Sequence, residues 1–230
     1  RTEVGPQTFF CWNRTGHGRV GMEYALVQSC DTWYYEMSQR IGPEKMSEVA
    51  RRLGFGDRLM IDVGGETRGV VPNENWKRTA LGQSWFDGDT VQASIGQGYV
   101  LTTPLQLATM TARIANGGRA VRPHLIVPDL PYPTEDLGFK PEHLAIVQNA
   151  MNRVTNTERG TAFKYTEVQD PALRIAGKTG TAQVARLSVN ERLRMLEDVR
   201  SLDYDRRNHA LFVGYGPLKN PRYSCAVIVE

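Results

Sequence analysis

Apolar residues recur at helical spacing in the first half of the chain. The stretch 43–53 has one apolar face, a Pro in its first turn and a Gly at its end, which predicts a helix. That face consists of Met46, Val49, Ala50 and Leu53. The stretch 21–41 fits a helix more roughly, with a break expected near Ser29. Residues 55–89 are rich in Gly and charge, and we expect loops and short turns there.

Two further helices are predicted between residues 103 and 154. A Thr-Pro pair at 103–104 suits the cap and first turn of a helix that ends near Asn116. A linker rich in Pro and acidic residues follows over 123–141. Apolar residues then repeat at helical spacing from Leu144 to Val154, which indicates a last long helix.

The pattern changes to short strands after about Gln169. Strands are predicted at 173–184, 210–215 and 223–229, the last of which ends in a run of mostly β-branched residues. The intervening segment 190–207 is strongly charged, and we expect it to be a mobile excursion.

This order of elements predicts an α+β fold. Residues 1–168 form a mainly helical subdomain, and residues 169–230 supply the strands of an antiparallel sheet. Consecutive strands without alternating helices argue against a doubly wound fold.

Composition narrows the function classes. Hydrophobic residues make up 40% of the 230 residues and charged residues 23%, which is typical of a globular protein. The net charge of +3, without clustered basic and aromatic residues, argues against nucleic acid as a partner. The longest uncharged stretch, 90–112, is too polar for a membrane span. Three cysteines cannot form a disulfide framework.

The segment from Lys178 to Ala182 is the strongest candidate for chemistry. Lys178 brings a positive charge, Thr179 and Thr181 bring hydroxyl donors, and Gly180 with the preceding Gly177 would let a ligand backbone lie against the strand. Such a strand suits a ligand that carries a carboxylate. The alternative is an exposed Lys on an edge strand that its glycines weaken.

A Lys-Thr-Gly triplet accompanies a Ser-x-Asn or Ser-x-Asp motif in enzymes whose own serine becomes acylated during the reaction. This chain has three such motifs, beginning at Ser29, Ser188 and Ser201, so the motif alone decides nothing. Ser188 lies too close to Lys178 in sequence to form an opposite wall, and Ser201 lies in the charged excursion. We therefore expect Ser29 to face the Lys178 strand across a groove.

Five motifs together carry a family resemblance. They are Gly16-His17-Gly18, Gln28-Ser29-Cys30-Asp31, Ile95-Gly96-Gln97-Gly98-Tyr99, Thr103-Pro104-Leu105-Gln106 and Lys178-Thr179-Gly180-Thr181-Ala182. In this order the chain resembles a class B penicillin-binding protein, closest to the penicillin-binding protein 2 type, the cell-elongation transpeptidase of Gram-negative bacteria. The resemblance covers nearly the whole chain and implies a partial penicillin-binding/serine β-lactamase-like transpeptidase fold.

The chain departs from the family in one respect. It contains no Ser-x-x-Lys, and the nearest match, from Thr161 to Lys164, has Thr for Ser and lies in the wrong place. In the family the nucleophile motif precedes the segment that starts here. We therefore expect residues 1–230 to be a partial transpeptidase domain without its first strands and final helix, inactive alone and not acylated.

The resemblance implies a role for each matched residue. Ser29 would relay a proton to the leaving nitrogen, and Lys178 would bind the substrate carboxylate and favour a reactive Ser29. Thr179, Gly180 and Thr181 would bind substrate, and the Thr181 amide would be one oxyanion donor. Asp31 stands where the family more generally has Asn, and an ionised Asp suits a lysine partner. The alternative for Asp31 is an acid on a helix surface.

Cys11, His17 and Cys30 form a candidate metal site. Thiolates and imidazole together suit Zn²⁺, which usually takes four ligands in a structural site. Some relatives resemble this chain in having such a site, with a fourth ligand upstream. The alternative is two buried thiols and a loop histidine. Catalysis would require no cofactor.

The leading functional hypothesis is a D,D-transpeptidase that cross-links peptidoglycan stem peptides through a serine acyl-enzyme and is a target of β-lactams. The resemblance implies a periplasmic domain of a protein anchored in the inner membrane, whose partner is a membrane glycosyltransferase of the elongation machinery. Two alternatives remain at this point: a β-lactamase or β-lactam sensor of the same fold, and a non-catalytic, zinc-stabilised binding module.

Overall fold

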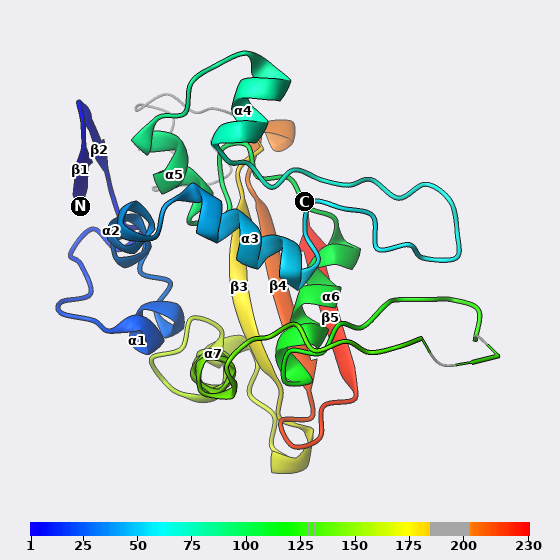
Figure 1. Cartoon of the computed structure of the whole chain (residues 1–230). Helices are drawn as coiled ribbons and strands as arrows, with labels where there is room; N and C mark the ends of the chain where they lie inside the picture. The colour runs from blue at the N-terminus through cyan, green and yellow to red at the C-terminus, as the bar shows by residue number, and fades with distance from the viewer. Residues whose placement is uncertain (128, 131, 185–202) are drawn as a thin grey trace.

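A three-stranded antiparallel sheet lies at the centre of the molecule (Figure 1). The computed structural model describes every residue except 128, 131 and 185–202. The strands β3 (Ala176–Ala182), β4 (His209–Gly216) and β5 (Tyr223–Val229) follow one another in the order β3-β4-β5. The three predicted strands and their antiparallel pairing are therefore confirmed.

The first of these strands begins later than the predicted residue 173. Asp170 caps a 3-10 turn over Pro171–Leu173 by accepting a hydrogen bond from the Ala172 amide, so the chain is not yet extended there. The other 3-10 turns among the described residues are Phe163–Tyr165 and Tyr204–Arg206.

Two helices pack against this sheet and close the main core. Helix α6 (Pro104–Ala115) contacts β4 and β5, and helix α7 (Pro141–Asn156) contacts β3. Four buried side chains, one from each of α6, α7, β3 and β4, form the core cluster: Ile114, Met151, Ala176 and Tyr215. Thr103 begins α6 with the expected cap, because its hydroxyl accepts from the Gln106 amide and the Gln106 side chain accepts from the Thr103 amide.

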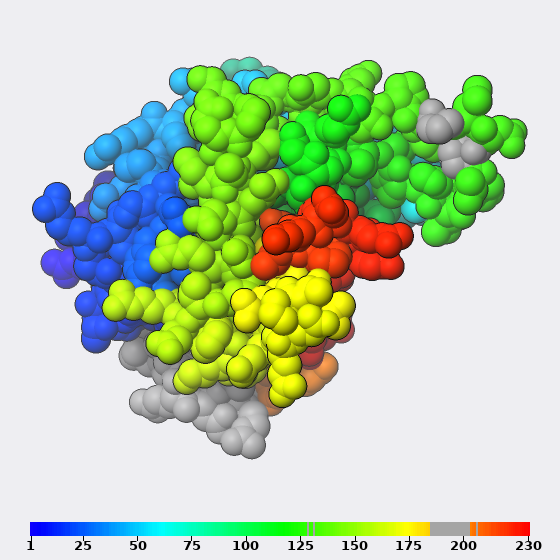
Figure 2. All heavy atoms as spheres, turned by 90° about the horizontal axis from the view of Figure 1, so that it is seen from below, coloured from blue at the N-terminus to red at the C-terminus, as the bar shows by residue number. Residues whose placement is uncertain are grey.

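The N-terminal helices lie beside the two sheet-packed helices α6 and α7. They are α1 (Met22–Val27), α2 (Asp31–Ile41) and α3 (Pro43–Leu53). Seen from below in Figure 2, the yellow-green residues of α7 and the segment after it lie between the blue N-terminal residues and the yellow and red residues of the C-terminal part of the chain, which bears the strands. The break expected near Ser29 is present, since α1 ends at Val27 and α2 starts at Asp31.

The prediction of loops over residues 55–89 is wrong for the second part of this segment, where two helices lie. Helix α4 (Glu74–Leu81) starts at an Asn73 cap, and helix α5 (Asp87–Ala93) follows it. Charge along α4 suggests a surface loop, but the Lys77 side chain is only 2% exposed and its ammonium lies 2.6 Å from an Asp89 carboxylate oxygen. A paired buried lysine breaks the usual rule that charged residues stay in solvent.

The first residues also depart from the helical expectation. Strands β1 (Thr2–Val4) and β2 (Gln7–Phe9) form a short hairpin. Val4 of this hairpin packs with Tyr35 and Val91 in a second core cluster. Three-residue strands leave too short an alternating pattern to be detected in the sequence.

Most of the predicted charged excursion lies outside the described residues, and so do Ser188 and most of the motif at Ser201. Among the residues that the structure does describe, no helix has the length and apolar character needed to cross a membrane.

Candidate active site and metal cluster

The structure brings Ser29 and Lys178 together across 149 residues of sequence. The Lys178 ammonium, on β3, donates to the Ser29 hydroxyl at 2.5 Å and to the Thr179 carbonyl at 2.8 Å. The two residues come from the two halves of the chain, one from the joint between α1 and α2 and the other from the sheet. They therefore form the opposite walls of one site.

The backbone at Ser29 explains how its hydroxyl reaches the strand. Ser29 has a φ of 51°, in the left-handed region that residues with a Cβ rarely adopt. The Cys30 amide donates to the Ala25 carbonyl at 2.8 Å, which holds this turn closed. Non-glycine residues in this region cluster at functional sites, because surrounding structure must hold them there.

Burial changes the charge equilibrium of Lys178. Loss of solvent lowers the pKa of the Lys178 ammonium to about 8, and attraction to the Asp31 carboxylate opposes this lowering only in part. At neutral pH the ammonium form is still the major one. The site therefore presents a desolvated cation beside a serine hydroxyl.

Asp31 lies beside this pair, but its direct partner differs from the expected lysine. Its carboxylate accepts a hydrogen bond from the Trp12 amide at 2.9 Å, and Lys178 acts on it only through Coulombic attraction. Burial raises the pKa of Asp31, against the lowering effects of the Trp12 amide and of Lys178. The side chain is half-buried, so it is not simply an acid on a helix surface.

Thr161 joins the site, although no motif in the sequence assigns it a role. Its hydroxyl lies 3.0 Å from the Thr179 hydroxyl, which leaves Thr179 tied to the loop that follows α7. The same loop reaches the other wall, because the Gln28 carboxamide donates to the Arg159 carbonyl. The loop thus contacts Gln28, the residue before Ser29, and Thr179 on β3. No spacing along the chain signals this link.

The two glycines that flank the Lys178-Thr179 pair have different roles. Gly180 is exposed on the strand, and a Cβ there would meet its nearest neighbour, Leu211, at 3.3 Å. Gly177 is buried, and a Cβ there would lie 2.3 Å from the Phe212 ring. The expectation that both glycines admit a ligand is wrong for Gly177, which is required by packing between β3 and β4. Thr181 is exposed at the same strand.

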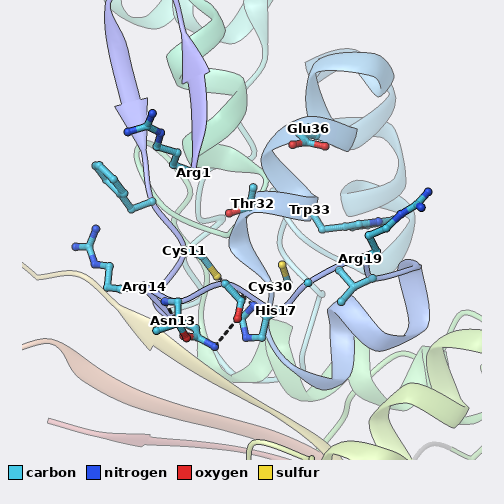
Figure 3. A pocket seen from close by; sticks show the side chains of 15 residues that line it. Arg1, Cys11, Asn13, Arg14, His17, Arg19, Cys30, Thr32, Trp33 and Glu36 are labelled. Atoms are coloured by element: carbon cyan, nitrogen blue, oxygen red, sulfur yellow. Dashed lines mark hydrogen bonds between the residues drawn. The ribbon is translucent and has the colours of Figure 1, made fainter.

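Cys11, His17 and Cys30 gather in a third part of the site region (Figure 3). Their ligand atoms all lie within 4.8 Å of one another, and Cys11 Sγ is 3.5 Å from His17 Nδ1. Both thiols are buried, and the buried His17 Nε2 has no hydrogen-bond partner. The cluster borders a hollow of about 690 Å³. Because Cys30 directly follows Ser29, the cluster adjoins the serine.

This arrangement can bind a carboxylate and move a proton. A desolvated ammonium attracts an anionic ligand terminus, and a hydroxyl within hydrogen-bond distance of it can pass a proton to a departing amine. The strand edge next to these groups offers backbone donors and acceptors to a peptide.

Comparison with known proteins identifies the family. The model of the penicillin binding protein transpeptidase domain matches residues 2–230. The chain belongs to this transpeptidase family. The described helices and antiparallel strands thus form the fold of a penicillin-binding transpeptidase domain, as the motif order indicated.

Relatives and solved structures agree with this assignment. The chain is 34% identical over 229 residues to the peptidoglycan D,D-transpeptidase MrdA of Acinetobacter baumannii, covering 95% of this chain. Penicillin-binding protein 2 from Helicobacter pylori, solved in complex with MreC, matches all of this chain and 40% of that one, with a TM-score of 0.86 and 33% identity. Pseudomonas aeruginosa PBP2 in complex with WCK 5153 matches 98% of this chain and 48% of that one, with a TM-score of 0.79 and 37% identity.

These relatives are longer than this chain. The 230 residues span 33% of the length of the Acinetobacter relative.

Proposed function

We propose that the protein containing this transpeptidase domain is a peptidoglycan D,D-transpeptidase of cell-wall elongation. The contact between the Lys178 ammonium and the Ser29 hydroxyl carries the proposal, because it supplies the carboxylate anchor and the proton carrier that this reaction needs. The 230 residues contain no Ser-x-x-Lys, so the proposal assigns the nucleophile to a part of the protein outside them.

The proposed reaction proceeds in two steps. The nucleophilic serine attacks the carbonyl of the penultimate D-alanine, and the terminal D-alanine leaves as a free amine after Ser29 passes it a proton. The amine of a second stem peptide then attacks the acyl-enzyme, forms the cross-link and releases the serine. Lys178 and Thr179 hold the substrate carboxylate, and the Thr181 amide donates to the developing oxyanion.

Asp31 and Gly180 have supporting roles in this proposal. Asp31 stabilises the positive charge of Lys178, since their attraction raises the pKa of the ammonium. Gly180 leaves the strand open to the substrate backbone, because it has no side chain beside the cleft.

The proposed setting extends the family assignment. A β-lactam would acylate the nucleophilic serine, and a membrane glycosyltransferase of the elongation machinery would be the partner protein. The domain would lie in the periplasm, with an anchor in the inner membrane. MreC, which is bound in the Helicobacter structure, is a second candidate partner.

Covalent labelling by a fluorescent penicillin tests the proposal. We expect the full-length protein to be labelled and the 230-residue chain to remain unlabelled. Ser29→Ala should slow labelling of the full-length protein about 100-fold or more, which is the lower range for loss of a general acid-base group. Ser84→Ala, at an exposed serine outside the site, is the control and should label like the wild type.

The outcomes separate the competing functions. Failure of the full-length protein to label would contradict the proposal and favour a binding module. Rapid hydrolysis of penicillin by the full-length protein would instead indicate a β-lactamase.

We also propose that Cys11, His17 and Cys30 hold a structural Zn²⁺. A tetrahedral zinc ion places its sulfur and nitrogen ligands roughly 3.5 Å apart, given bonds of about 2.3 and 2.0 Å. The Cys11–His17 separation of 3.5 Å matches this value. These three residues would occupy three of the four coordination positions of the zinc ion. The ion would then link Cys30, in the turn beside Ser29, to Cys11 and His17.

Metal content of the purified full-length protein tests the zinc proposal. We expect about one Zn²⁺ per protein, and loss of most of it in Cys30→Ser, because a serine hydroxyl is a poor zinc ligand. Cys225→Ser removes the exposed thiol of β5 and should leave the metal content unchanged. Equal zinc in the wild type and Cys30→Ser would contradict the assignment.

A further inference from the structure

A tight turn at Gly96-Gln97-Gly98 projects one glutamine side chain towards the strand β3. Gly96 and Gly98 have φ angles of 75° and 70°, which are available to glycine and strained for other residues. The Gln97 amide donates to the Gln92 carbonyl at 3.0 Å. After the turn, the Tyr99 ring packs at a tilt against the Trp76 ring, with the ring centroids 5.4 Å apart. The turn is therefore held on both sides.

The Gln97 carboxamide bonds to the backbone at the end of β3. Its Nε2 donates to the Thr181 carbonyl at 2.6 Å, and its Oε1 accepts from the Gln183 amide at 3.3 Å. Residues two apart in a strand direct their backbone groups to the same edge, and β4 pairs with the opposite edge of β3. Gln97 thus uses a carbonyl and an amide that an added peptide strand would use.

This contact lies next to the predicted ligand-binding residues. Lys178 donates to the Thr179 carbonyl, two residues before Thr181 on the same edge. Thr181 is exposed and Gln97 is half-buried, so a ligand lying along Lys178 and Thr179 would reach the Thr181 carbonyl next. At that carbonyl it would meet the Gln97 carboxamide.

We propose that Gln97 is a specificity-determining residue of the transpeptidase site, whose carboxamide occupies the Thr181 carbonyl until a ligand amide N–H replaces it. This inference rests on the proposed function. An acyl-D-alanyl peptide carries an amide N–H next to its reacting carbonyl, and so does a penicillin with an acylamino side chain. A ligand without that N–H leaves the Gln97 hydrogen bond in place, whereas a ligand with it must first displace Gln97, so Gln97 reduces the advantage that an amide N–H gives a ligand.

Selective acylation of the full-length protein tests this role. Benzylpenicillin has the amide N–H, and penicillanic acid lacks the whole acylamino group. Gln97→Ala removes the competing donor, so we expect it to raise the acylation efficiency of benzylpenicillin roughly three- to tenfold relative to that of penicillanic acid. Gln97→Glu cannot donate at neutral pH and should shift the ratio in the same direction, which provides a second variant if the first folds poorly.

Gln148→Ala is the matched control. Gln148 is also half-buried, and its carboxamide donates to the Ile114 carbonyl at 2.7 Å, away from the strand edge. Its removal should leave the ratio of the two efficiencies unchanged.

Two results would overturn the inference while leaving the proposed function intact. An unchanged ratio in both Gln97 variants would mean that Gln97 only supports the turn. A ratio that falls would mean that Gln97 binds the ligand directly. Absence of acylation in the wild-type protein by either compound would overturn both proposals.

Discussion

At the scale of single residues, the chemistry depends on one half-buried, strongly desolvated cation. Lys178 lies on a strand edge, where a lysine would ordinarily extend into solvent. Here the fold directs it to Ser29 and the Thr179 carbonyl, and burial lowers the pKa of its ammonium to about 8. A lysine with this pKa changes charge close to the physiological range, so its protonation can be followed by kinetics.

The pH dependence of acylation should report Lys178. Below pH 8 the ammonium is present and attracts a ligand carboxylate. Above this pH the neutral amine predominates, so we expect the acylation efficiency of the full-length protein to fall by up to about tenfold per pH unit. The measurement is the second-order rate of penicillin acylation between pH 6 and 10 in the free enzyme.

Lys178→Arg provides the control for this profile. An arginine keeps its charge throughout the range, so the variant should be slower but should lose the decline near pH 8. A decline that persists in the arginine variant would assign the titration to another group.

At the scale of elements, strand β3 has two functions. Some of its residues pack against β4, and others are exposed where a ligand can lie. Gly177 faces Phe212 within the sheet, whereas Gly180 is exposed. The position of Lys178 therefore depends on how closely β3 approaches β4. Glycine thus allows close packing at position 177 and leaves the strand accessible to a ligand at position 180.

Gly177→Ala should damage both stability and acylation. Its Cβ would lie 2.3 Å from the Phe212 ring and 2.7 Å from the Val213 carbonyl, so β3 must move away from β4. We expect a loss of about 1–3 kcal/mol in the free energy of unfolding, measured by urea denaturation of the full-length protein.

Gly180→Ala is the control on the same strand. Its Cβ would approach Leu211 at 3.3 Å, which a small shift relieves. Its unfolding midpoint should stay closer to the wild type than that of Gly177→Ala, and the reverse order would contradict this account of β3.

At the scale of the whole molecule, the helical and strand segments share one core. Met151 of α7 contacts the same cluster as Ala176 of β3 and Tyr215 of β4. Glu23 of α1 accepts hydrogen bonds from Asn149 and Arg153 on α7. Helix α7 thus connects the wall that holds Ser29 with the wall that holds Lys178.

Met151→Ala should destabilise both halves together. The side chain is 3% exposed, and its truncation leaves a cavity, so we expect a loss of about 2–5 kcal/mol. All four tryptophans precede residue 169, so their fluorescence reports the helical half, while far-ultraviolet circular dichroism reports the whole domain. The two transitions should coincide.

Ile146→Ala tests the specificity of that loss. Ile146 is exposed on the same helix, and its truncation should change stability by no more than about 0.5 kcal/mol. Separate transitions for the two probes in Met151→Ala would show instead that the halves unfold independently.

Strong local patterns in the sequence were enough to predict several elements. Apolar periodicity and end signals predicted α3, α6 and α7, and β-branched runs predicted the last strand, because these preferences act over a few neighbouring residues. Motif order also identified the residues of the two walls, Ser29 and Lys178. The helices α4 and α5 were not predicted, because the buried ion pair that Lys77 and Asp89 form between them leaves no apolar pattern in the sequence.

Only the tertiary structure shows which residues of the site contact one another. The hydrogen bonds of Ser29 to Lys178, Thr161 to Thr179 and Gln97 to Thr181 join positions 149, 18 and 84 residues apart. Such contacts depend on how β3, the turn after α1 and the loop after α7 pack around a shared core. Packing is a long-range property of the chain, and local preferences do not encode its distances.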